Sequence, residues 1–191
     1  ILDAVLDHVM FDGWSDTAIK AAAKDLSLDP FFISELFPKG PIDLIAYFVE
    51  NADDQMEAAL IERDALSLKI RERITLAVRL RLEMYTPYRE AVRNALTLMA
   101  LPQNAPHGLK LTAGTVSRMG YATGDTSTDY NYYTKPLPVS SAYPSTPLSW
   151  LDEQSATTVN TGEFMQRRIE KDMQFKNAKF KIKNNHHEKT K

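Results

Sequence analysis

The sequence predicts an all-α protein in which three short N-terminal helices precede a longer helical region. Apolar residues recur at the 3.6-residue spacing of an amphipathic helix through most of the chain up to Tyr121. Serine, proline and glycine, which start or stop helices, separate these stretches. The first three helices, with a tight turn between the second and third, follow one another in the order of a helix-turn-helix.

Composition narrows the classes of function. The chain has 191 residues, 43% of them hydrophobic and 25% charged, as in an ordinary globular domain. It has no cysteine, which excludes disulfides and thiol chemistry, and its four histidines are scattered or terminal. We therefore expect no metal site, no catalytic residues and no cofactor. No apolar run approaches the ~18 residues of a membrane span. We expect no signal peptide, and an N-terminal extension or targeting peptide stays open.

The first forty residues predict the helix-turn-helix. Helical spacing begins at Ile1 and runs to Val9, Ser15 caps a second helix that ends near Asp25, and Pro30 opens a third that ends near Phe37. The third helix has no Arg, Lys, Asn or Gln to contact a base edge. Residues 1–60 hold three lysines against twelve acidic residues, a net charge of −9, which repels phosphate. We interpret this region as a retained scaffold; specific DNA binding is the disfavoured alternative.

Three longer helices should follow. Pro41 opens the first, the second runs from about Ala65 to Tyr85, and Thr86 begins the third, which ends before Pro102. We interpret the arginines of the second helix as a solvated or ion-paired coat rather than a phosphate clamp, because they spread around its axis; they are Arg71, Arg73, Arg79 and Arg81. A loop at 103–107 and a weak helix at 109–121, interrupted by two glycines, complete this part.

The segment from Gly120 to Lys135 combines turn residues with four tyrosines. Its simpler interpretation is a helix cap. In that interpretation a side-chain oxygen of Asp125, Ser127 or Thr128 accepts a hydrogen bond from a backbone N–H in the first turn of a helix that starts near Asp129. The functional alternative is a tyrosine-rich rim on a pocket or partner surface.

Four prolines follow that segment, and one helix cannot pass through all of them; they are Pro136, Pro138, Pro144 and Pro147. We expect extended or kinked backbone over 135–147 and a short helical turn around Trp150. A last helix should start near Thr161. Residues 163–191 hold nine basic and four acidic residues, a net charge of +5. Their end could lie on an anionic membrane surface or form a solubilising, fraying terminus.

Several sequence blocks are similar to those of the COQ-nine family. FDGW at 11–14, LFPKGPIDL at 36–44 and GDTSTDYNYYTK at 124–135 are the most specific, and SWLDE and FMQRRIEKDMQ extend the resemblance to about residue 175. The family comprises ubiquinone-biosynthesis accessory proteins with a TetR-like all-helical fold. The resemblance implies a helix-turn-helix-like subdomain at 1–40, a helical lipid-binding region at 41–175 and a basic tail at 176–191.

The resemblance implies lipid binding without catalysis. Family members hold isoprenoid lipid or quinone in a cavity among the C-terminal helices and present it to a di-iron quinone hydroxylase. By position, the surface for lipid or partner comprises Met119, Tyr121, Asp125, Tyr130, Tyr132 and Tyr133. The membrane-facing residues are Phe164, Arg167, Arg168, Lys171 and Phe175.

The resemblance also implies a location and an assembly. It predicts peripheral association with an anionic membrane, at the cytoplasmic side of a bacterial inner membrane or the matrix side of the mitochondrial one. TetR-like folds often pair through their last two helices, so we expect a homodimer.

The chain departs from the family pattern over residues 108–150. Gly120 stands where the family usually has tryptophan, and the four prolines replace an apolar helix. Two alternatives therefore accompany the lipid-binding interpretation. One is a TetR-like transcriptional regulator, and the other is a protein-interaction scaffold that has lost lipid binding.

Overall fold

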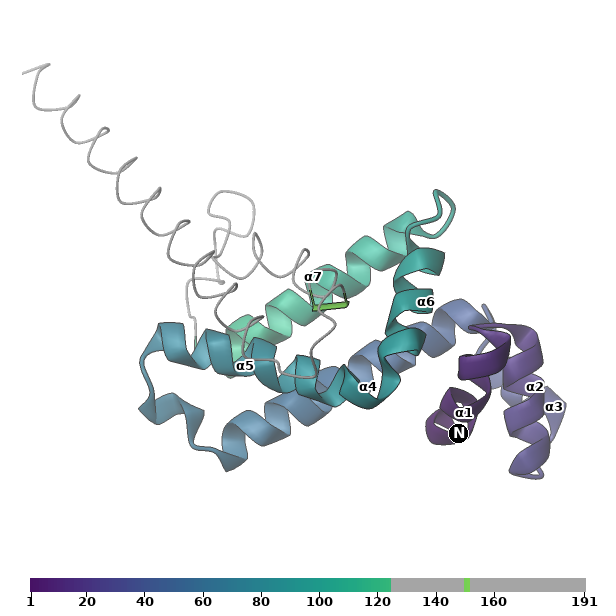
Figure 1. Ribbon diagram of the computed structural model, residues 1–191, viewed down its shortest axis with the longest axis horizontal. Coiled ribbons are helices and arrows are strands. Elements are labelled where there is room, and N and C mark those ends of the chain that lie inside the picture. Colours follow the sequence, from purple (N-terminus) through teal and green to yellow (C-terminus); the bar gives the residue numbers. More distant parts are fainter. Residues whose placement is uncertain (125–149, 152–191) are drawn as a thin grey trace, which may run out of the picture.

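A computed structural model of the chain describes residues 1–124 together with 150 and 151. The described residues form helices and no strand, which confirms the predicted all-α class. Figure 1 shows a long central helix, α4, with the short N-terminal helices at one end and α5, α6 and α7 along the rest. The helix-turn-helix geometry and the TetR-like relationship stay predictions.

Of the three N-terminal helices, the second has its predicted Ser15 cap and the third has a cap at Asp29 that was not predicted. The three helices are α1 (Leu2–Asp12), α2 (Asp16–Asp25) and α3 (Pro30–Leu36). The Ser15 hydroxyl accepts from the backbone N–H of Ala18, and the Asp29 carboxylate accepts from that of Phe31 at 2.9 Å. Because these side chains satisfy amides that a helix start leaves unpaired, α2 and α3 begin where the sequence indicated.

The FDGW and LFPKGPIDL blocks both contain a glycine that the backbone requires. Gly13 has φ +65° directly after α1, and Gly40 has φ +56° directly before α4. A Cβ at Gly40 would also lie 2.8 Å from an Asp16 carboxylate oxygen. These two glycines reverse the chain in conformations that other residues rarely adopt.

The longer helices follow, with two short 3-10 turns between them. They are α4 (Pro41–Glu62), η1 (Ala65–Ser67), α5 (Ile70–Tyr85), η2 (Thr86–Tyr88), α6 (Arg89–Met99) and α7 (Ala105–Ala122). The single helix predicted over 65–85 is therefore wrong, because the chain breaks at Leu68, whose backbone is extended. The Glu72 side chain caps the restart at Lys69.

The weak, interrupted helix predicted near 109–121 is instead continuous, and it starts four residues earlier. Gly114 and Gly120, at which the interruption was predicted, lie inside α7 without breaking it, and so does Gly108. At Gly108 the helix approaches α6 so closely that a Cβ would lie 3.2 Å from the Met99 Cβ. Packing therefore outweighs the modest helix propensity lost at each glycine, about 1 kcal/mol.

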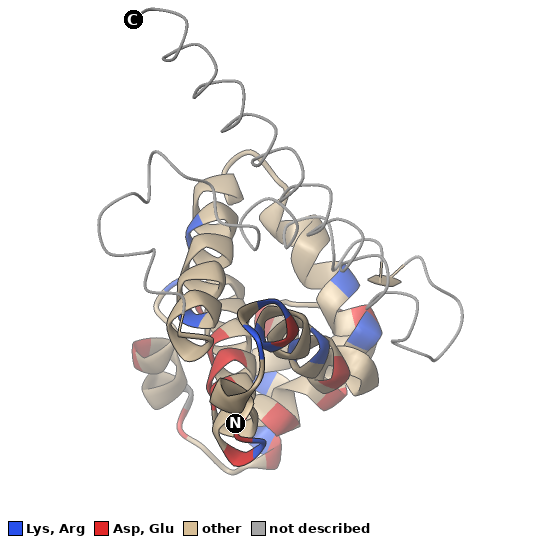
Figure 2. Ribbon diagram, turned by 90° about the vertical axis from the view of Figure 1, so that its left-hand side faces the viewer, with Lys and Arg blue, Asp and Glu red and all other residues tan. Residues whose placement is uncertain are grey.

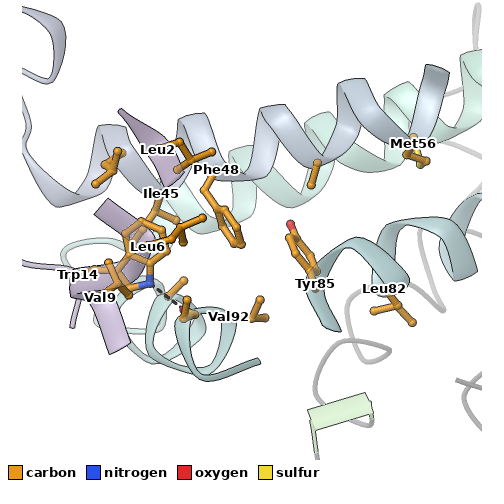
Figure 3. Close-up of a cluster of buried hydrophobic side chains, with 14 of the residues drawn as sticks. Leu2, Leu6, Val9, Trp14, Ile45, Phe48, Met56, Leu82, Tyr85 and Val92 are labelled. Atoms are coloured by element: carbon orange, nitrogen blue, oxygen red, sulfur yellow. Dashed lines mark hydrogen bonds between the residues drawn. The ribbon is translucent and has the colours of Figure 1, made fainter. Parts of the chain in front are cut away.

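The core joins the N-terminal helices to the longer ones. Trp14 is buried and its indole N–H donates to the Ala91 carbonyl of α6 at 2.7 Å. Its ring lies 5.4 Å from Phe48 of α4, which stacks at 5.2 Å on Tyr85 of α5. Figure 3 shows Trp14, Phe48 and Tyr85 in one cluster of buried side chains. One continuous core therefore holds α1, α4, α5 and α6 together.

Candidate functional site

An apolar cavity of about 390 Å³ lies between α4, α5, α6 and α7. Aliphatic and aromatic side chains dominate its wall, which is the composition of a lipid or small-molecule site. Phe48, Tyr85 and Val92 point toward one another from three of these helices in Figure 3. The lining residues are Ile45, Phe48, Val49, Arg81, Tyr85, Val92, Ala95, Leu96, Met99, Ala100, Ala105, Gly108, Leu109, Leu111, Thr112 and Thr115.

The cavity follows α7 lengthwise. Its lining residues on this helix run from Ala105 to Thr115. At a rise of about 1.5 Å per residue, these ends lie about 15 Å apart. Leu109 lines the cavity and is 72% exposed, so the cavity reaches solvent beside it. The lining residues of α7 therefore span about three helical turns, enough to lie along a chain of several carbon atoms.

One end of the cavity is polar. Arg81 of α5 is 2% exposed, and its Nη1 lies 2.7 Å from Oδ1 of Asp53, a buried residue of α4. The Thr115 hydroxyl of α7 donates to Asp53 Oδ2 at 2.9 Å and accepts from Arg81 Nη2 at 3.2 Å. Arg81 and Thr115 both line the cavity. We call these three residues the polar triad; it links α4, α5 and α7 at the cavity wall.

Burial controls the electrostatics of the polar triad. Removal from water raises the pKa of the Asp53 carboxyl above its usual value, while attraction to Arg81 and the hydrogen bond from Thr115 oppose that rise. The Arg81 guanidinium also lies 5.0 Å from the centre of the Tyr85 ring, a cation–π contact. A buried ion pair of this kind is costly to form and costlier to break.

A second ionic cluster lies next to the first on the α4–α7 interface. Arg118 of α7 donates to Glu57 through Nε at 2.7 Å and through Nη2 at 2.8 Å, and it also bonds Asp54. Hydrogen bonds to Glu57 and Asp54 raise the pKa of the Arg118 guanidinium. This cluster is partly exposed and does not line the cavity, so we interpret it as an interhelical clamp.

The arginines of α5 differ from the predicted coat. Arg79 is exposed and pairs with Glu83 at 2.8 Å, as a surface coat requires. Arg81 is ion-paired, as expected, but it is buried, so its predicted place in a surface coat is wrong. Arg73 binds the backbone instead: its guanidinium donates hydrogen bonds to the carbonyls of Leu66, Leu68 and Thr123. Helical rotation alone could not reveal that Arg81 faces an acidic residue of another buried helix.

Of the predicted site residues, two lie in the described part of the chain. Met119 is a fully buried residue of α7, about one helical turn after Thr115, and it does not line the cavity. Tyr121 is 66% exposed and available to a partner. The others lie outside the described residues; they are Asp125, Tyr130, Tyr132, Tyr133, Phe164, Arg167, Arg168, Lys171 and Phe175. The helix cap proposed near Asp129 and the backbone expected over 135–147 also lie outside them.

Arginines bind backbone carbonyls of the described residues on both sides of residues 125–149. Before these residues, Arg73 donates to the Thr123 carbonyl at 3.1 Å. After them, Arg89 donates to the Trp150 carbonyl at 2.6 Å and lies 4.3 Å from the Trp150 ring centre, while Arg93 donates to Leu151. Trp150 is 1% exposed and helical, which agrees with the turn predicted there. The sequence offered no sign of these arginine contacts.

Neither a metal centre nor a membrane span is found in the described residues. Within 1–124 and 150–151, no three His, Asp or Glu side chains gather in a way that could bind an ion. In the same ranges no helix is long and apolar enough to cross a membrane.

A second cavity, of about 550 Å³, lies between α2 and α3. Lys20, Lys24 and Ser34 contribute to its wall together with apolar residues such as Ile33. Asp16 lies on the same wall, so the charged residues of this cavity are of both signs and its lining is less uniformly apolar than that of the first cavity. The cavity along α7 is therefore the better candidate site.

Fold and site define a class: an all-helical protein with an elongated apolar cavity that ends in a buried polar triad. The COQ9 family model matches residues 105–176, which include α7. The chain belongs to the COQ9 family.

Curated relatives match over most of the chain. The fruit fly protein named "Ubiquinone biosynthesis protein COQ9, mitochondrial" is 32% identical over 178 residues, 91% of this chain and 54% of its own length. The human protein of that name is 32% identical over 176 residues, which are 88% of this chain and 55% of the human protein. COQ9-B of Xenopus laevis is 33% identical over 185 residues, which are 93% of this chain and 63% of the Xenopus protein. The chain thus spans little more than half the length of the first two.

Proposed function

We propose that this chain is a non-enzymatic accessory protein of ubiquinone biosynthesis, as the names of its relatives suggest. In this proposal the cavity along α7 binds the isoprenoid tail of a quinone intermediate. The surface around Tyr121 then presents the head group to a di-iron quinone hydroxylase. Four helices that meet around an elongated apolar cavity are the observation that supports this role most directly.

The proposal includes a location. The relatives are named mitochondrial, so we place this chain at the matrix side of the inner membrane, bound peripherally. The membrane contact would come from the basic segment that contains Phe164, Arg167, Arg168, Lys171 and Phe175, with a homodimer as the assembly. The bacterial alternative receives no support from the names of the relatives.

Native mass spectrometry of the purified chain, followed by solvent extraction, tests ligand binding. We expect a co-purified isoprenoid or quinone in the wild type. Ala95→Phe should remove it, because Ala95 lines the cavity and a phenyl ring there fills the space. Ala58→Phe is the matched control, since Ala58 is an exposed residue of α4.

The outcomes separate the candidate functions. Loss of lipid from Ala95→Phe alone, with helicity intact by circular dichroism, supports cavity binding. A folded wild type that carries no lipid and takes up none from prenyl-quinone vesicles would contradict it. Capture of the hydroxylase by that empty protein would favour the interaction scaffold instead, which the proline-rich segment also suggests.

A further inference from the structure

All the lysines of the acidic N-terminal region gather around the cavity between α2 and α3. Residues 1–60 contain three lysines against twelve acidic residues. Lys20 and Lys24 line this cavity of about 550 Å³, and Lys39 lies between Pro38 and Gly40, which also line it. A region with a net charge of −9 therefore places its cations around one hollow.

Lys20 and Lys24 have no carboxylate partner within the described part of the chain. No Asp or Glu oxygen there lies within 4.0 Å of either ammonium group. The two side chains are one helical turn apart on α2, so their Cβ atoms are separated by about 5–6 Å and both can reach the same ligand group. A carboxylate has two oxygens and can accept a hydrogen bond from each lysine. The pair is thus suited to an anionic group.

The floor of the cavity is apolar. Ile19, Ala23, Ile33 and Phe37 line it and are buried. The lining on α2 extends over residues 16–27, a length of about 16 Å. A hydrocarbon chain on this floor would be removed from water, which favours its binding. An apolar floor with exposed cations at its edge suits an amphipathic anion.

Asp16 adds one negative charge at an end of the cavity, and its position limits the effect. It lies in the first turn of α2, where the helix dipole stabilises a carboxylate. Its Oδ1 is packed against Gly40, since an added Cβ at Gly40 would lie 2.8 Å from it. Lys24 is eight positions further along α2, about 12 Å away. A ligand carboxylate beside Lys24 therefore meets the lysines rather than Asp16.

We propose that the cavity between α2 and α3 binds a single-chain amphipathic carboxylate, with its head group between Lys20 and Lys24 and its chain on the apolar floor. This site is separate from the proposed quinone cavity. The two cavities share no lining residue, and Figure 1 shows α2 and α3 away from α7. The inference is therefore independent of the proposed function.

The acidic surroundings favour a single molecule with one negative charge. An anionic bilayer would also meet the twelve acidic residues of this region and be repelled by them. A phosphate head group carries more negative charge than a carboxylate at neutral pH when it has a single ester bond, so it would be repelled more strongly. A fatty carboxylate has the smallest anionic head that both lysines can share.

Binding of three probes to the full chain by isothermal titration calorimetry tests the proposal. The probes are dodecanoate, dodecanol and dodecyltrimethylammonium, which have similar tails, each below the concentration at which it forms micelles. The wild type should bind dodecanoate about tenfold more tightly than dodecanol, because two exposed cations each contribute modestly. The cationic probe should bind most weakly.

Charge variants test the two lysines. Lys20→Gln with Lys24→Gln should weaken dodecanoate binding about tenfold and leave dodecanol binding unchanged. Asp16→Asn should strengthen dodecanoate binding about twofold, because it removes the negative charge from the wall. Lys110→Gln is the matched control, since Lys110 is an exposed residue of α7 that lines neither cavity, and it should behave as the wild type.

A space-filling variant assigns the probe to this cavity. Ser34 is exposed and lines the cavity, so Ser34→Trp should abolish dodecanoate binding while the core stays intact. Equal binding of dodecanoate and dodecanol by the wild type would overturn the inference, as would dodecanoate binding that survives the double lysine variant. Displacement of dodecanoate by a double-stranded oligonucleotide would also overturn it, because the lysines would then bind a phosphate backbone. The quinone cavity is tested separately by Ala95→Phe.

Discussion

Trp14 connects the N-terminal helices to the cavity-forming ones through a single buried side chain. Its indole donates to the Ala91 carbonyl across 77 positions of sequence, and its ring packs on Phe48. Trp14→Phe should lower the free energy of unfolding by about 1–3 kcal/mol, because it removes that hydrogen bond and leaves a small cavity. Chemical denaturation measures the loss. Phe11→Leu is the control, since Phe11 is 91% exposed and should change stability little.

Arg81→Met should destabilise the fold by about 3–5 kcal/mol at neutral pH, since it leaves the buried Asp53 carboxylate without its cation. Burial already raises the pKa of Asp53, and loss of Arg81 raises it further. A carboxyl with a raised pKa in the folded state favours folding when protonated, and that stability is lost as the pH rises through the folded-state pKa. The gap between wild type and variant should therefore narrow as the pH falls from 8 to 5.

Denaturation at several pH values measures that gap, and two variants control it. Asp54→Asn affects an exposed carboxylate and should cost less than about 1 kcal/mol. The double variant Asp53→Leu with Arg81→Met should recover stability without the pH dependence. A gap that stays constant from pH 8 to 5 would show that Asp53 does not take up a proton when its cation is removed.

At the scale of the element, two of the three glycines of α7, Gly108 and Gly114, have opposite surroundings. A Cβ at Gly114 would meet nothing within 4 Å, whereas one at Gly108 would lie 3.2 Å from the Met99 Cβ and 3.3 Å from its carbonyl oxygen. Gly114→Ala should stabilise the protein by about 0.5–1 kcal/mol, because alanine favours a helix interior. Gly108→Ala should lose that gain or destabilise the protein, because α6 and α7 must move apart to make room for the added methyl group. Thermal unfolding of both variants checks the difference in sign.

The contact between α6 and Trp150 is also an element-scale feature. Arg89 covers the Trp150 ring and binds its carbonyl. Arg89→Gln should release Trp150 to water and shift the tryptophan fluorescence to the red. The chain has two tryptophans, and the signal from Trp14 should not change. Arg79→Gln, which removes only an exposed pair with Glu83, should leave the spectrum unaltered.

Charge is distributed unevenly over the whole molecule. Residues 1–60 carry a net charge of −9 and residues 163–191 a net charge of +5. In Figure 2 the acidic positions of the described helices gather in the lower part of the view, around the N-terminus. An anionic surface should therefore attract only the C-terminal part of the chain.

Flotation with vesicles tests this asymmetry. The chain should float with vesicles that contain anionic lipid and less with neutral ones, and added salt should weaken the binding. Reversal of charge at Arg167, Arg168 and Lys171 to glutamate should abolish flotation. Equal flotation of wild type and variant would show that these residues do not carry the membrane contact.

Local patterns in the sequence were sufficient for the helical class and for several helix boundaries. Ser15 accepts from the N–H it was expected to cap, Pro41 opens α4, and Trp150 is helical. Such features depend on residues that are close together in the sequence, so a local sequence pattern can predict them. The break at Leu68 and the unbroken path of α7 were not predicted, because packing against other helices outweighs propensities of about 1 kcal/mol.

The sequence by itself determined that this chain is helical, that its N-terminal part is acidic, and that its blocks are those of the COQ9 family. Tertiary structure alone decided where the cavity lies and which polar residues reach it. Asp53, Arg81 and Thr115 come from three helices and are separated by 28 and 34 positions. In the sequence each of them is one ordinary position in a helical pattern. Only the packing of α4, α5 and α7 brings the three together in a buried site.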